Sequence, residues 1–217
     1  MPRKHLTFIG TNNLLADLFR ERDYFVEQYG RSTKVKIDFT DEDIDKQIEL
    51  LLKQSNSDIF ILLSGHLQSS DLIKQTQENR INSFLINSIG PVLFSEYILK
   101  KKANARIIII GSESGMKGSY DLTYALAKSS LRMYVRQKRI GINQQLLLLS
   151  PSTIEDLGMT TRRKDIHNLK EYKIGHPKKS FLMSEELVEI ICFLINSPKY
   201  LTNTEIEING GKFTLMK

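Results

Sequence analysis

A tyrosine, a lysine and a serine in the middle of the chain have the types and spacing of an acid–base site. Tyr124 and Lys128 are four residues apart, so on a helix they share one face. An ammonium beside a phenol stabilises the phenolate, and a tyrosine with an ordinary pKa of about 10 needs such a neighbour for proton transfer near neutral pH. Ser112 lies twelve residues before Tyr124, directly after the strand-like run 106–110. We therefore expect Ser112 to hold a substrate oxygen beside the phenol.

The composition is that of an ordinary soluble domain. The chain has 217 residues, of which 41% are hydrophobic and 26% are charged. This length is enough for one sizeable core and short for two, so we expect a single domain over residues 1–217. The apolar runs are far too short to cross a bilayer, and the N-terminal run ends at Ile9 before Gly10. Neither membrane insertion nor secretion is indicated.

The cysteine, the histidines and the net charge limit the possible ligands. Cys192 is the only cysteine, and its apolar neighbours predict a buried helix position in a protein of the reducing cytoplasm. The four histidines have no metal-ligand spacing, so we expect no metal site. A net charge of +6 favours anionic ligands. No helix-turn-helix, zinc or aromatic-basic pattern supports nucleic acid as that ligand.

Short apolar runs alternate with longer amphipathic patterns along the whole chain. Strands such as 59–63 and 107–110 are apolar throughout, as in parallel strands covered by helices on both faces. The pattern predicts a doubly wound α/β fold with a mostly parallel sheet of about seven strands. The strands are expected at 5–9, 24–29, 34–39, 58–63, 106–110, 143–149 and 204–208, and the helices at 14–22, 41–54, 69–78, 82–101, 124–137 and 184–196.

Small and polar residues follow three of these strands. Gly10, the pair Ser64-Gly65 and the pair Gly111-Ser112 each come directly after a predicted strand. In doubly wound sheets ligands bind at the carboxyl ends of the strands. We therefore expect these residues to line one site together with Tyr124.

The order of the motifs resembles the short-chain dehydrogenase/reductase family over nearly the whole chain. Leu63-Ser-Gly65 resembles the family's Asn-Ala-Gly, and Ile86-Asn87 resembles its central-helix motif. Ser112, Tyr124 and Lys128 follow in the family's order. The remaining pieces are Gly10 after the first strand, Lys36-Ile-Asp38-Phe-Thr-Asp41, Pro151-Ser152 in place of Pro-Gly, and Ile206-Glu-Ile-Asn-Gly210-Gly211.

This resemblance implies a carbonyl–alcohol oxidoreductase that uses NAD or NADP. Tyr124 would exchange the proton and Ser112 would orient the substrate. Lys128 would lower the pKa of Tyr124 and bind the nicotinamide ribose, and Asn87 would anchor a water that relays protons to Lys128. Asn87 could equally satisfy a helix break near Gly90-Pro91. The implied cofactor-binding residues are Gly10, Thr11, Asn13, Leu14, Arg31, Asp38, Phe39, Ser64, Gly65, Tyr124, Lys128 and Pro151.

The chain departs from the family pattern at the nucleotide end. The glycine-rich turn reads Ile9-Gly10-Thr-Asn-Asn-Leu14-Leu-Ala16, so two of three glycines are missing where the backbone approaches a pyrophosphate. Leu14 could crowd a phosphate, although helix amides still offer an anion site. Only 28 positions separate Gly10 from Asp38, so we expect no full helix between the second and third strands. Arg31 resembles the arginine of NADP-using members, which favours NADP over NAD.

The segment 161–179 and two helices suggest further partners. The segment carries seven Lys/Arg residues, which would suit a small anionic substrate or form a solvated face. Helices 82–101 and 124–137 correspond to the elements that the family uses for dimers and tetramers. We expect Phe94, Tyr97, Ile98, Met133 and Tyr134 to supply that contact.

Two other functions compatible with the sequence are kept. A non-catalytic scaffold or cofactor sensor could retain the fold after the glycine turn has changed. A sugar-modifying member acting in surface polysaccharide synthesis is the third possibility.

Overall fold

Six strands form one sheet in which all neighbours are parallel. The computed structural model describes residues 3–68, 71–161 and 166–214. The strand order is β2-β1-β3-β4-β5-β6. The strands are β1 (His5–Ile9), β2 (Phe25–Tyr29), β3 (Ile59–Leu62), β4 (Arg106–Ile110), β5 (Gln145–Pro151) and β6 (Thr204–Ile208). The predicted α/β class with a parallel sheet is confirmed, with six strands rather than seven.

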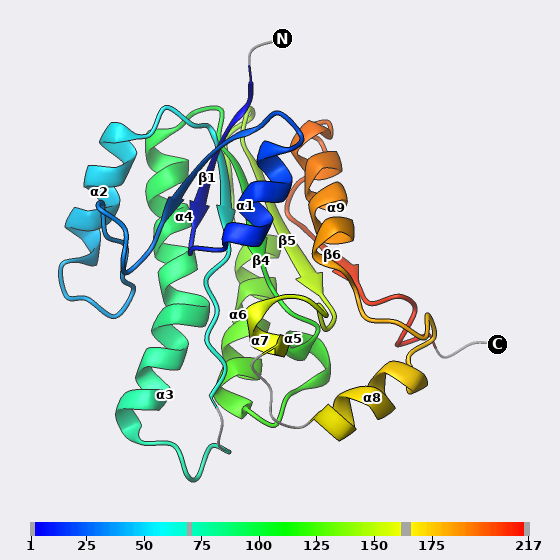
Figure 1. Cartoon of the computed structure of the whole chain (residues 1–217). Helices are drawn as coiled ribbons and strands as arrows, with labels where there is room; N and C mark the ends of the chain where they lie inside the picture. Colours follow the sequence, from blue (N-terminus) through cyan, green and yellow to red (C-terminus); the bar gives the residue numbers. More distant parts are fainter. Residues whose placement is uncertain (1–2, 69–70, 162–165, 215–217) are drawn as a thin grey trace.

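Helices cover both faces of this sheet, and each face has its own apolar core (Figure 1). Helices α1 (Asn13–Arg20) and α9 (Ser184–Asn196) pack on one face through residues such as Phe19 and Ile191. The opposite face is covered by α2 (Ile44–Gln54), α4 (Gly90–Lys101) and α6 (Leu122–Gln137), with Phe94 and Leu131 in the core. Burial on both faces explains the continuous apolar runs of β3 and β4.

The segment after β2 forms neither the predicted strand nor a helix. Residues 34–39 contribute only an isolated bridge between Gly30 and Lys36. The apolar alternation of this segment has another cause, because Ile37 and Phe39 point into the core under α2 and α4. No helix occurs between the end of β2 and Ile44, so the expected shortening of this connection is confirmed.

A π-helical turn interrupts the long helix that leads into α4. The run consists of α3 (Gln77–Phe84), the π-helical turn η1 (Leu85–Ile89) and α4. Pro91 has no N–H to donate to the carbonyl four residues earlier, which is that of Asn87, and its ring crowds that carbonyl. A π-turn widens the helix there and accommodates the proline. The expectation of a helix at 69–78 is wrong for the described residues, because 71–75 form turns and α3 begins only after its cap Thr76.

The carboxyl ends of the strands carry three short helices that the sequence pattern did not indicate. These are α5 (Ser114–Lys117), α7 (Gly158–Thr161) and α8 (Ile166–Gly175). Figure 1 shows α5, α7 and α8 together at the end of the sheet toward which β4 and β5 point. The bridge between Ile154 and Leu182 closes the base of the segment that bears α7 and α8.

Three predicted residue environments are corrected. Phe94 and Ile98 are fully buried in the core under the sheet, so neither is available for contact with another chain. Cys192 is half-buried rather than fully buried on α9.

No helix in the described part of the chain is long and apolar enough to cross a membrane.

Candidate active site

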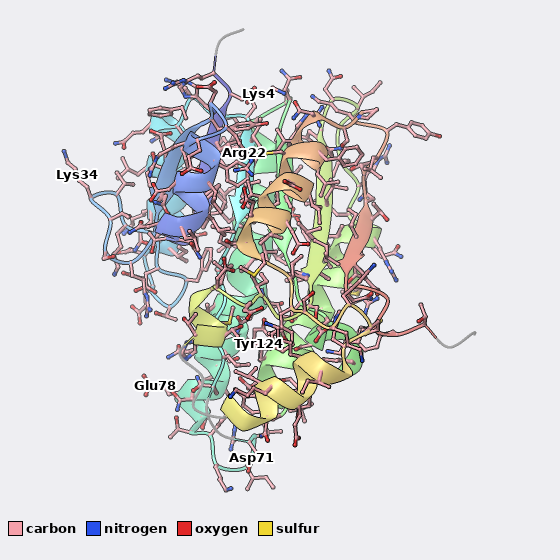
Figure 2. The ribbon with its side chains drawn as sticks, turned by 45° about the vertical axis from the view of Figure 1, so that its right-hand side comes forward. Lys4, Arg22, Lys34, Asp71, Glu78 and Tyr124 are labelled. Atoms are coloured by element: carbon pink, nitrogen blue, oxygen red, sulfur yellow. The ribbon has the colours of Figure 1, made fainter. Side chains whose placement is uncertain are left out.

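Tyr124 and Ser112 meet at the carboxyl end of the sheet. Tyr124 lies in the first turn of α6, and its side chain is 5% exposed. Ser112 follows β4, and its hydroxyl is close enough to Tyr124 to act on the pKa of the phenol. The Oγ of Ser112 accepts a hydrogen bond from the amide of Ser114 at 3.1 Å. Figure 2 shows Tyr124 at the end of the sheet where α7 and α8 also lie.

The pKa of the Tyr124 phenol is raised rather than lowered. Burial is the largest cause, and the charge of Asp121 and the neighbouring Tyr120 add to it, while the hydrogen bond with Ser112 acts in the opposite direction. Burial disfavours the phenolate because it removes water from the charged form. Lys128 is not among the causes of this shift, so its expected effect on the phenol stays a prediction.

Lys128 is buried one turn after Tyr124 and bridges two strand ends. Its Nζ donates to the carbonyl of Ile110 at 2.9 Å and to that of Ser64 at 3.2 Å. The same Nζ lies 5.9 Å from the centre of the Tyr124 ring. Burial lowers the pKa of Lys128 to about 7. At neutral pH this lysine is near the midpoint of its titration, and a nearby anion would favour its charged form.

Asn87 fixes the loop after β3 instead of pointing into open space. Its Nδ2 donates to the carbonyl of His66 at 2.8 Å, and its Oδ1 accepts from the amide of His66 at the same distance. The Nδ2 also contacts Ser83 Oγ at 3.2 Å. The side chain is thus used within the protein, to hold the loop of His66 and not to satisfy the backbone near Gly90-Pro91. A relayed water near Lys128 stays a prediction.

Asp121 is a site residue that the sequence analysis missed. It is fully buried and caps α6 by accepting from the amide of Tyr124 at 3.2 Å. The carboxylate also accepts from Gln75 Nε2 at 3.0 Å and from the amide of Gln68 at 2.7 Å. One side chain therefore sets the start of the helix and holds the facing loop. An aspartate directly before a helical pattern is the capping signal that could have revealed it.

Glu113 is a second residue that was not anticipated. It is buried directly after Ser112, and its Oε1 pairs with Lys117 at 2.6 Å and Lys212 at 3.0 Å. Burial works to raise the pKa of this carboxyl, but the two lysines hold the pKa below its usual value. Lys212 follows β6, so the contact ties the segment after the last strand to the serine loop.

The turn after β1 contains the glycine that its geometry requires. Gly10 has a φ of 102°, and a Cβ there would lie 3.2 Å from the amide nitrogen of Ser64. Its packing brings the turn against the loop of Ser64 and Gly65, as expected of neighbouring strand ends. The Oγ of Ser64 is buried and has no hydrogen-bond partner within the described ranges. A buried hydroxyl without a partner fits a polar ligand group at this point.

The rest of that turn is polar and already hydrogen-bonded. Asn12 caps α1 by accepting from the amide of Leu15 at 3.1 Å. The amide of Asn12 donates to Gln28 Oε1 at 2.7 Å, and Gln28 Nε2 donates to Asn13 Oδ1 at 3.3 Å. Thr11 is exposed, and Leu14 is 42% exposed in the first turn of the helix.

The adenosine side of the expected cofactor site is more open. Arg31 is exposed, and its charge acts on Asp38. Burial works to raise the pKa of Asp38, but hydrogen bonds from Thr40 and the charges of Lys36 and Arg31 hold the pKa below its usual value. The ring of Phe39 is buried, and a Cβ on Gly90 would come within 2.2 Å of it. Only the backbone of Phe39 is therefore available to a ligand.

The remaining expected contacts are distributed around the same edge. Pro151 ends β5, and its carbonyl accepts from the amide of Glu113 at 2.9 Å. In the basic segment, Lys173 pairs with Glu155 at 2.6 Å, whereas Lys170 and Lys178 are exposed. Arg162, Arg163 and Lys164 lie outside the described residues. Among the residues that are described, no group of three or more His, Cys, Asp or Glu could hold a metal ion.

Several solved structures to which this chain is similar are short-chain dehydrogenases/reductases. One from Brucella melitensis, named glucose/ribitol dehydrogenase, has a TM-score of 0.83 and 19% identity, covering 98% of this chain and 97% of its own. A short-chain dehydrogenase family protein from Francisella tularensis has a TM-score of 0.78 and 18% identity, covering 97% and 98%. Aldohexose dehydrogenase from Thermoplasma acidophilum has a TM-score of 0.80 and 15% identity, covering 96% and 93%.

At these identities the likeness establishes the fold. No protein-family model and no curated protein matches the sequence. The chain thus has the short-chain dehydrogenase/reductase fold, as its motifs indicated, and places Ser112, Tyr124 and Lys128 together at the carboxyl end of the sheet.

We expect the buried Lys128 to make stability depend on pH. Its pKa is about 7 in the folded protein and 10.5 as the ordinary value, so the unfolded chain binds more protons between these limits. Stability therefore rises with pH in this window, by at most about 1.4 kcal/mol per pH unit. Urea unfolding at pH 7.0 and 8.5 should show that rise for the wild type and a smaller one for Lys128→Met. Equal rises in both proteins would contradict the assignment.

Proposed function

We propose that this protein is an NAD(P)-dependent oxidoreductase that interconverts a carbonyl and a secondary alcohol. One observation carries the proposal: the buried Tyr124 lies beside both Ser112 and Lys128. The fold shared with solved dehydrogenases supports it. We also propose that residues 1–217 form one domain and that the protein is cytoplasmic.

Proton transfer belongs to Tyr124 in this proposal. Because the pKa of the phenol is raised, the side chain is protonated at neutral pH and can donate to a carbonyl oxygen during reduction. Ser112 orients the same oxygen by hydrogen bonding. Lys128, with a pKa of about 7, gains its proton when an anionic group approaches, and then stabilises the phenolate that donation leaves behind.

The proposed cofactor is NADP, with NAD possible. A nicotinamide ring supplies or accepts the hydride when it is bound. The nicotinamide ribose would be held by Lys128, Tyr124, Ser64 and Gly65, and Pro151 would lie beside the nicotinamide ring. The turn of Gly10, Thr11, Asn13 and Leu14 would face the pyrophosphate. Arg31, Asp38 and the backbone of Phe39 would hold the adenosine.

The substrate is proposed to be small and anionic. Lys170 and Lys178 are exposed on and after α8, at the edge that carries Tyr124 (Figure 2). A negative group on the substrate would be attracted to this edge.

The hydrogen-bonded turn after β1 is the observation that favours the second candidate, a non-catalytic scaffold or sensor.

Removing the phenolic hydroxyl tests the proposed chemistry. We expect Tyr124→Phe to lower turnover by about 10² to 10⁴, because that is the usual contribution of general acid catalysis. Steady-state kinetics with the first carbonyl substrate found should give this loss, while NADPH affinity measured by fluorescence changes little. Lys128→Met serves as the comparison and should lose both turnover and affinity. Near wild-type turnover in Tyr124→Phe would refute the catalytic assignment.

The cofactor preference depends on Arg31. A charge-assisted hydrogen bond to a phosphate contributes about 1.5–3 kcal/mol, so Arg31→Ala should weaken NADPH binding roughly tenfold or more. NADH affinity should be nearly unchanged. Lys34→Ala removes the same charge from a side chain that extends away from the protein, as Figure 2 shows, and is the matched control. Equal losses for NADPH and NADH would mean that Arg31 does not distinguish the two.

Self-association is also proposed, through the exposed side of α6. Leu126 and Met133 are 51% and 67% exposed on this helix, seven residues apart. Residues at this spacing share a face of a helix. Light scattering should give a mass of at least twice the 25.0 kDa chain, and Leu126→Asp should shift it toward the monomer. A monomer mass for the wild type at micromolar concentration would exclude the proposal.

A further inference from the structure

The carboxamide of Gln28 is bound across the first turn of α1. Gln28 lies on β2 and is in register with Phe8 of β1. Its Oε1 accepts from the amide of Asn12 at 2.7 Å, and its Nε2 donates to Asn13 Oδ1 at 3.3 Å. Both polar ends of one side chain are therefore engaged by the segment that follows Gly10.

A second side chain occupies the same turn. The Oδ1 of Asn12 accepts from the amide of Leu15 at 3.1 Å. The first amides of a helix have no partner within the helix and are positively polarised, which is why they bind anions. Here the side-chain oxygens of Gln28 and Asn12 accept hydrogen bonds from these backbone amides, as the oxygens of a bound anion would.

The two occupants differ in how easily they can leave. Asn12 belongs to the turn itself and caps the helix, so its displacement would cost helix stability. Gln28 comes from the neighbouring strand, and only its side chain must rotate. Only one of its two hydrogen bonds is short. The bond from the Asn12 amide is 2.7 Å long, whereas the bond to Asn13 Oδ1 is 3.3 Å long.

We propose that Gln28 is a built-in competitor for the pyrophosphate of a dinucleotide and sets the affinity of this turn for it. Binding requires the Gln28 carboxamide to release the amide of Asn12, which a phosphate oxygen then takes. The apparent affinity is reduced by the fraction of molecules in which the contact is closed. This inference rests on the proposed cofactor, but the turn can be tested with a simpler anion.

The experiment compares Gln28→Ala and Gln28→Glu with the wild type. We measure NADPH binding by fluorescence and inorganic pyrophosphate binding by titration calorimetry. Gln28→Ala should bind both about three- to tenfold more tightly, the range expected for removing one hydrogen bond. Gln28→Glu should bind both about tenfold more weakly, because a carboxylate holds the amide more strongly and repels phosphate. Gln137→Ala removes an exposed glutamine at the far end of α6 and should match the wild type.

The outcomes separate this inference from the proposed function. If pyrophosphate follows the predicted order while NADPH binds no variant, Gln28 has the assigned role and the oxidoreductase proposal fails. If Gln28→Ala binds pyrophosphate no more tightly than the wild type, the role of Gln28 is overturned, whatever NADPH does. Should Gln28→Ala not fold, Gln28→Glu decides, and unchanged pyrophosphate binding in that variant overturns the inference. Absence of pyrophosphate binding in every protein also overturns it.

Discussion

The side-chain amine of Lys128 joins α6 to the sheet. Its two hydrogen bonds reach the carbonyls of Ile110 and Ser64, which follow neighbouring strands, so one side chain fixes α6 against the ends of β3 and β4. Burying this group is costly and lowers its pKa to about 7. Asp121 and Asn87 then hold the surrounding loops.

The sequence predicted the sheet better than the loops around it. The apolar runs of β1 and β4 predicted those strands at their observed bounds, because burial on both faces leaves a clear pattern. The same reasoning failed at 34–39, where Ile37 and Phe39 alternate because they fill the core. Helices α7 and α8 have no such pattern, since they lie over the edge of the sheet and not on its faces.

The candidate site was predictable as a set of residues but not in its electrostatics. The spacing of Tyr124 and Lys128 correctly places them on one face of a helix. Spacing does not give burial, however, and burial moves the pKa of the phenol up and that of the ammonium down. Asp121 and Gln28 act through partners far away in the sequence, Gln68 and Asn12, so their roles depend on the folded chain.

The two ends of the candidate site satisfy their polar groups in opposite ways. At the turn after β1, side chains of the protein occupy amides that a glycine-rich turn leaves to a ligand, so this turn needs no ligand to be fully hydrogen-bonded at Asn12 and Leu15. At the strand end that Lys128 contacts, the hydroxyl of Ser64 is buried without a partner in the described part of the chain. An unpaired buried hydroxyl costs free energy that a bound polar group recovers. In the proposed cofactor site, binding is therefore favoured at the Lys128 end and opposed at the Gly10 turn.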